Sequence, residues 1–103
     1  MNKKLSLEAL NRLSKEEFIH SKKNPVILIL DNIRSLNNVG SIFRTADAFK
    51  VEEILLYGIT ATPPHREITK TAIGATETVS WSVIENLNNT IVQLKNEGYT
   101  VIS

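Results

Sequence analysis

The sequence contains no cysteine and one tryptophan, and its formal net charge is only +1 over 103 residues. Without cysteine the chain forms no disulfide bond and offers no thiolate to a metal ion, which is typical of proteins from a reducing compartment. The small net charge means that local groups of cations would have to attract a nucleic acid. Neither an apolar run of membrane-spanning length nor a signal-peptide core is present. We therefore expect one small cytoplasmic domain.

An apolar run at residues 26–30 is followed by a polar stretch and then by a helical pattern. The run has no polar alternation, which predicts a strand buried on both faces in a parallel sheet. Turn-forming residues follow from Asp31, and we expect Asn38 to be the N-cap of a helix. The helix is predicted over residues 39–49, where apolar residues recur at intervals of three and four. Arg44 falls opposite the apolar face, among small residues.

Asn38 and Arg44 each allow two interpretations. Arg44 is either a solvated surface arginine or a cation that reaches a phosphate or a hydroxyl past its small neighbours. Asn38 is either only a helix cap or also part of a site, because open α/β sheets place ligands where a strand ends and a helix begins.

The rest of the chain continues the alternation of strand and helix, which predicts an α/β fold with a parallel sheet and flanking helices. Further strands are predicted at residues 53–57 and 79–84, with the start of a fourth at residues 99–102. Helices are predicted at residues 67–73, with Gly74 as the C′ residue, and along the apolar positions Leu87, Ile91 and Leu94, ending at Gly98.

A loop at residues 60–66 contains two prolines, which neither a helix nor a central strand accommodates. His65 and Arg66 lie at its tip, and Lys70 follows in the next short helix. These three residues are either ordinary exposed side chains or contacts for a substrate, because the loop follows the carboxyl end of a strand, on the same edge of the sheet as Asn38.

Residues 1–24 are charged and are predicted to form two short helices, the second begun by a capping box from Ser14 to Glu17. This extension precedes an α/β domain at residues 25–103. Its lysines either are solvated or face an RNA, and its glutamates offset part of their charge. His20 and His65 are far apart and have no second ligand three or four residues away, so no metal site is expected.

The stretch LNNVGSIFRTADAF at residues 36–49 resembles the first motif of the SpoU, or TrmH-like, branch of the SPOUT RNA methyltransferases. The positions that match are Asn38, Val39, Gly40, Ser41, Ile42, Arg44, Thr45 and Ala46. A second stretch, KTAIGA at residues 70–75, is similar to the family segment after the second strand. The resemblance covers residues 25 to about 81 and joins two motifs at compatible spacing.

This resemblance implies the N-terminal half of an α/β-knot fold, with the knotted C-terminal half absent from the sequence. That half holds the S-adenosylmethionine site in the family, and no GxGxxG, GKS or GKT motif replaces it here. We therefore expect no cofactor-binding residues in this chain and no methyl transfer by it alone. An ending directly after an apolar stretch suggests a truncated domain. The resemblance also implies a tRNA or rRNA substrate and a homodimer at full length.

The resemblance further implies that Asn38 and Arg44 are catalytic in methylation of a ribose 2′-hydroxyl. Arg44 would act either as the base or as a clamp on an RNA phosphate, and Asn38 would orient the site. One alternative is a non-catalytic RNA-binding module, which would bind RNA without binding S-adenosylmethionine. A phospho-receiver domain is disfavoured, because Asn32 follows Asp31 where such domains carry an acidic pair.

Overall fold

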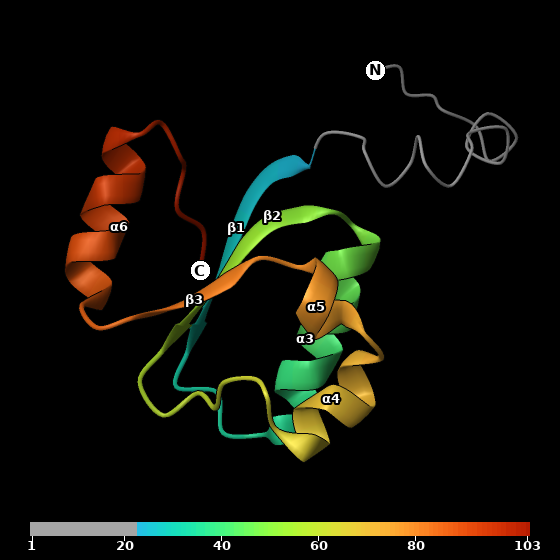
Figure 1. Ribbon diagram of the computed structural model, residues 1–103. Coiled ribbons are helices and arrows are strands. Elements are labelled where there is room, and N and C mark those ends of the chain that lie inside the picture. Colours follow the sequence, from blue (N-terminus) through green and yellow to red (C-terminus); the bar gives the residue numbers. More distant parts are fainter. Residues whose placement is uncertain (1–22) are drawn as a thin grey trace, which may run out of the picture.

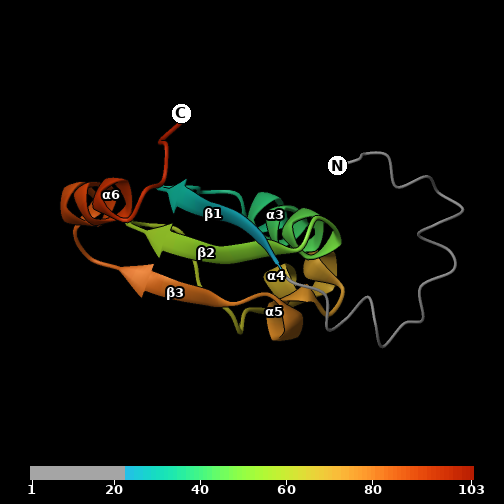
Figure 2. The ribbon, with the colours of Figure 1, turned by 90° about the horizontal axis from the view of Figure 1, so that it is seen from above.

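Three parallel strands form the sheet, in the order β1-β2-β3, and their arrows point the same way in Figure 2. This computed structural model describes residues 23–103, so the helices predicted before residue 23 lie outside the described residues. The strands are β1 (Asn24–Asp31), β2 (Val51–Tyr57) and β3 (Trp81–Ile84), and the helices are α3 (Leu36–Ala48), α4 (Arg66–Ala72), α5 (Ala75–Thr78) and α6 (Leu87–Asn96). The predicted parallel α/β fold is confirmed.

The core lies between one face of the sheet and the helices α3, α4 and α5, which gather on one side of the strands in Figure 1. Phe43 on α3 and Ile54 on β2 are fully buried in it, and Ile68 joins them from α4. Leu30 and Leu56 lie side by side in register on the same face. The predicted apolar face of α3 therefore packs on the core. Phe49 is the exception, because it lies past the helix end and is 67% exposed.

The expectation that the first strand is buried on both faces is wrong. Among the described residues β1 is an edge strand, and in its apolar run only Leu30 is buried, whereas Ile27 and Ile29 on the other face are half-buried. Its apolar run faces the core with alternate residues only, so the other residues lie on the outer face at the open edge of the sheet. An unbroken apolar run therefore does not reveal by itself how many neighbours a strand has.

The predicted fourth strand at residues 99–102 is also wrong, because these residues form no ladder with β1. A hollow of about 800 Å³ separates the segment after α6 from the edge strand, and both border it. The Tyr99 hydroxyl donates a hydrogen bond to Glu52 Oε1 at 2.8 Å. This bond is the largest cause that raises the pKa of Tyr99 above its ordinary value, and partial desolvation and the charges of nearby carboxylates act in the same direction. Strand propensity alone does not decide pairing, which depends on tertiary context.

The remaining differences from the predicted elements are small. α4 begins at Arg66 and ends at Ala72, and Ile73 itself adopts the left-handed conformation (φ 51°) expected for Gly74. Gly74 is also left-handed (φ 83°) and precedes α5, a helical turn that the sequence did not predict. β3 begins at Trp81 rather than at residue 79. α6 has the predicted bounds, ending before Gly98, and lies apart from the other helices (Figure 1).

Candidate functional site

The loops that follow β1 and β2 leave the sheet at the same edge, because Asp31 at the end of β1 lies opposite Tyr57 at the end of β2. The first loop leads into α3 and the second into α4. All five predicted site residues lie on these two helices or just before them: Asn38 and Arg44 on α3, Arg66 and Lys70 on α4, and His65 directly before α4. The carboxyl edge of a parallel sheet is where such folds place ligands.

Ser35, not Asn38, is the N-cap of α3. Its side-chain oxygen accepts a hydrogen bond from the backbone amide of Asn38 at 3.1 Å. The helix therefore begins three residues earlier than predicted, with Asn38 in its first turn. Several neighbouring polar residues are good N-caps, and the sequence does not distinguish among them. The extended backbone at Ser35 (ψ 118°) identifies this residue as the N-cap. Asn38 is consequently released from capping and exposed.

The shift of the cap gives a stability prediction. Ser35→Ala is expected to lower the free energy of unfolding by about 1 kcal/mol, because it removes the acceptor for a first-turn amide. Asn38→Ala is expected to change it by less than about 0.5 kcal/mol, as is usual for an exposed residue. Urea unfolding followed by circular dichroism measures both variants. An equal loss in the two variants would contradict Ser35 as the cap.

Asn38 lines an open hollow of about 350 Å³ between α3 and the edge strand. The apolar part of its wall comes from Leu28, Ile33 and Ile42, and its polar part from Asn38, Ser41 and Thr45. No hydrogen bond joins the Asn38 side chain to another residue within 23–103. The amide and two hydroxyls are therefore available to a polar ligand at the rim of an apolar surface.

Arg44 is exposed on α3, six residues after Asn38. At about 1.5 Å and 100° per residue, the two Cα atoms are separated by roughly 9 Å along the helix axis and about 120° around it. Arg44 lines neither of the hollows next to Asn38 and next to Lys70, and its side chain has no hydrogen-bond partner in the described part of the chain. The structure therefore places both residues on one helix but not in one pocket.

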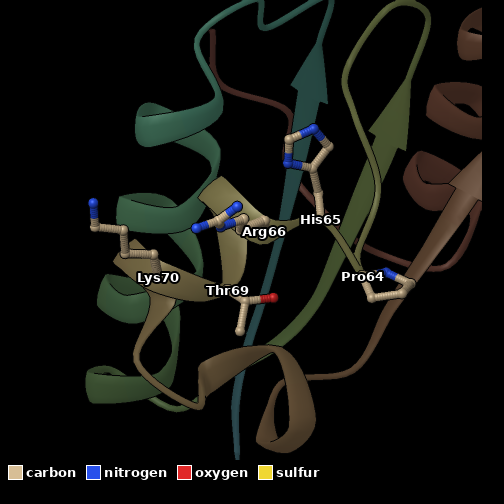
Figure 3. A pocket seen from close by; sticks show the side chains of 5 residues that line it. All are labelled: Pro64, His65, Arg66, Thr69 and Lys70. Atoms are coloured by element: carbon tan, nitrogen blue, oxygen red, sulfur yellow. The ribbon is translucent and has the colours of Figure 1, made fainter.

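His65, Arg66 and Lys70 come together around a shallow hollow of about 530 Å³, completed by Pro64 and Thr69 (Figure 3). Arg66 and Lys70 extend from α4 on the same side in this view. His65 is the N-cap of α4, since its Nδ1 accepts a hydrogen bond from the Glu67 amide at 3.2 Å. The structure therefore gives these three predicted residues a common concave surface.

α3 and α4 pack closely at Gly40, which is buried. A Cβ atom built on Gly40 would overlap Thr71 Oγ1 and would lie 2.8 Å from the carbonyl oxygen of Ile68. Gly40, one of the small residues near Arg44, therefore allows α4 of the same chain to pack closely against α3. This contact holds α4 against α3. It thereby fixes the hollow around His65, Arg66 and Lys70, called the basic hollow below, relative to the helix that carries Asn38 and Arg44.

The sequence did not single out Thr60, which is the buried polar residue of the described part of the chain, 6% exposed. Its Oγ1 accepts a hydrogen bond from the amide of Ile33 at 2.9 Å. The same hydroxyl lies 3.1 Å from the Leu30 carbonyl oxygen and 2.9 Å from the Tyr57 carbonyl oxygen, to which it donates. Threonine in a loop is common, so no sequence signal would have identified this contact.

Two further properties concern residues 23–103 only. None of the helices there is long and apolar enough to cross a membrane. No group of three acidic or histidine side chains in this range is arranged to hold a metal ion.

Comparison with known proteins assigns the chain to a family. It is 33% identical over 85 residues to an uncharacterized tRNA/rRNA methyltransferase of Borreliella burgdorferi, covering 82% of this chain and 37% of the relative. It is 36% identical over 78 residues to the 23S rRNA (guanosine-2′-O-)-methyltransferase RlmB of Neisseria meningitidis, covering 76% and 31%. The chain thus spans about a third of the length of these relatives.

A solved structure supports the same assignment. The AdoMet-bound rRNA methyltransferase of Sinorhizobium meliloti superposes with a TM-score of 0.62 at 28% identity, covering 82% of this chain and 32% of that one. The model of the SpoU rRNA methylase family matches residues 25–103. With its parallel sheet and first-motif helix in place, this chain belongs to the SpoU rRNA methylase family.

Proposed function

We propose that this chain provides the RNA-facing part of a ribose 2′-O-methyltransferase acting on tRNA or rRNA. The observation that carries the proposal is the placement of Asn38 and Arg44 on α3, immediately after the carboxyl end of β1, without side-chain partners in the described part of the chain. The name of the Neisseria relative specifies transfer to a guanosine 2′-oxygen. An rRNA substrate, as that name specifies, favours the cytoplasm, and the family resemblance favours a homodimer at full length.

In this reaction the ribose 2′-hydroxyl gains a methyl group and gives its proton to water or to an RNA phosphate. Arg44 is assigned the role of clamping an RNA phosphate beside the reacting hydroxyl, because guanidinium stays protonated and matches phosphate with two parallel hydrogen bonds. Asn38 is assigned to the hydroxyl itself, since its amide both donates and accepts.

S-adenosylmethionine, when bound, supplies an activated methyl group on a positively charged sulfur. The hollow beside Asn38 and the hollow on α4 do not fit this donor. The side chains around Asn38 include no carboxylate to face its positive groups, and the hollow on α4 is itself basic. We derive no step through the donor and assign the residues of this chain to the RNA.

Two titrations of the 103-residue chain test the assignment. Calorimetry with S-adenosylmethionine is expected to give no binding, and fluorescence anisotropy with a labelled single-stranded RNA is expected to give salt-dependent binding. Methyl transfer is then measured in a polypeptide that contains residues 1–103 and has the full length of the relatives. RNA binding without transfer in that polypeptide would favour the second candidate, a non-catalytic RNA-binding module. Absence of RNA binding would contradict both candidates.

The basic hollow gives a quantitative prediction. Lys70→Ala is expected to weaken RNA binding and to reduce the slope of log K against log salt by about 0.7, because one phosphate contact to a single strand is lost. Arg66→Ala is expected to act in the same direction. Lys95→Ala removes one exposed cation from α6, away from both hollows, and serves as the matched control. Anisotropy titrations at several salt concentrations measure all three, and an equal effect of Lys95→Ala would argue against a localised site.

A further inference from the structure

We propose that Thr60 is a positioning residue, whose hydroxyl fixes the loop entering α3 against the loop entering α4. The inference rests on the proposed function, because these loops lead into the helices that carry the residues assigned to RNA. Thr60 itself lines neither hollow. It acts through others: Ile33, whose amide donates to Thr60 Oγ1, forms part of the wall beside Asn38.

The hydroxyl of Thr60 uses its hydrogen-bonding capacity on both loops. It accepts from the Ile33 amide, which follows β1, and its single proton is shared between the Leu30 carbonyl on β1 and the Tyr57 carbonyl on β2. These partners lie 27, 30 and 3 residues away in the sequence. A valine has the same shape and makes none of these bonds, so the two loops would lose a buried connection.

Asn32 provides the second connection between the same two loops. Its Oδ1 accepts a hydrogen bond from the Ile59 amide at 2.9 Å, and its backbone is left-handed (φ 57°). Gly58 is also left-handed (φ 71°), and a Cβ atom on it would overlap Asn32 Oδ1. The loop after β1 and the loop after β2 are therefore in close contact, and their hydrogen bonds join them into one structural unit.

The consequence concerns the two groups of RNA-facing residues. α3 begins four residues after Asn32, and α4 begins six residues after Thr60. Asn38 and the basic hollow are thus attached to opposite sides of the same hydrogen-bonded unit. An RNA strand that contacts both groups needs them at a fixed spacing, and the Thr60 hydroxyl contributes to that spacing.

The test compares Thr60→Val with Thr60→Ser, which keeps the hydroxyl, and with Val79→Ala, which removes buried apolar atoms next to β3. RNA affinity is measured by anisotropy at a temperature where circular dichroism finds all variants folded. Thr60→Val is expected to bind several-fold more weakly, whereas Thr60→Ser and Val79→Ala are expected to bind within about twofold of the wild type. Equal weakening by Val79→Ala, or wild-type affinity of Thr60→Val, would overturn the proposal.

A second readout does not depend on RNA. In amide spectra of the 103-residue chain, Thr60→Val is expected to shift the signals of Asn38 and Glu67 together and to speed hydrogen exchange of the Ile33 amide. A shift confined to Ile33 would overturn the positioning role. If the wild-type chain binds no RNA, the proposed function is wrong, while these shifts still decide whether Thr60 couples the loops.

A second variant applies if Thr60→Val does not fold. Asn32→Gly removes the acceptor for the Ile59 amide while glycine tolerates the left-handed backbone. We expect it to weaken RNA binding and to shift the same two amide signals. Wild-type binding by a folded Asn32→Gly chain, with both signals in place, would contradict the proposed unit.

Discussion

Arg44→Ala is expected to reduce methyl transfer at least about a hundredfold, the size of effect seen when a preorganised charged or hydrogen-bonding group is removed from a transition state. The fold is expected to remain, because Arg44 is exposed and its side chain has no hydrogen bond within residues 23–103. Transfer is measured with radiolabelled methyl donor in a polypeptide of the full length of the relatives. Unfolding measurements on the same variant are expected to agree with the wild type within about 0.5 kcal/mol.

Arg44→Lys separates charge from geometry. It keeps the cation and loses the planar fork that binds a phosphate through two hydrogen bonds, so we expect it to recover only part of the lost activity. Lys95→Ala on α6 is the control for removal of an exposed cation and is expected to leave transfer unchanged. Near-normal turnover of a folded Arg44→Ala variant would remove Arg44 from the reaction and leave it as a surface arginine.

The elements that could be predicted from the sequence are those encoded by local patterns. Local apolar patterns mark the face of an element that packs on the core. The periodicity from Val39 to Ala46 predicted α3, and the apolar residues of β2 predicted the central strand. Tyr99 and the residues after it share the same apolar character but form no strand. Strand pairing requires a partner edge, and that is a property of the whole arrangement.

In the candidate site, too, features that depend on local sequence could be predicted, whereas features that depend on tertiary contacts could not. The grouping of His65, Arg66 and Lys70 followed from their closeness in the sequence and from their position after a strand. The contact of Thr60 with Leu30 joins residues 30 positions apart, so it depends on strand order and register. The cap at Ser35 depended on a choice among adjacent polar residues with similar propensity, which only the backbone conformation resolves.

Gly40→Ala is expected to lower the free energy of unfolding by about 1–3 kcal/mol, the usual cost of overpacking a tight contact. Alanine favours a helix over glycine by about 1 kcal/mol, so the clash must exceed that gain for the result to hold. The Thr71 side chain can rotate away only by giving up its hydrogen bonds to the carbonyls of Glu67 and Ile68. The Ile68 carbonyl, 2.8 Å from the new Cβ, belongs to the backbone of α4 and moves only with the helix.

Ser41→Ala is the matched control, because Ser41 is the next residue on α3 and is exposed. We expect it to leave stability unchanged or to raise it slightly through helix propensity. Urea unfolding of the two variants distinguishes a specific contact between α3 and α4 from a general response of the helix to alanine. Wild-type stability of Gly40→Ala would mean that α4 does not lie against α3 as closely as described.

The result also bears on why a glycine stands between Asn38 and Arg44. If Gly40→Ala separates α4 from α3, it moves the basic hollow away from Asn38, so RNA affinity should fall together with stability. The small residue then serves the packing that joins the two groups, rather than the approach of the RNA to α3. A loss of RNA affinity at unchanged stability would instead indicate that the RNA itself comes close to this position.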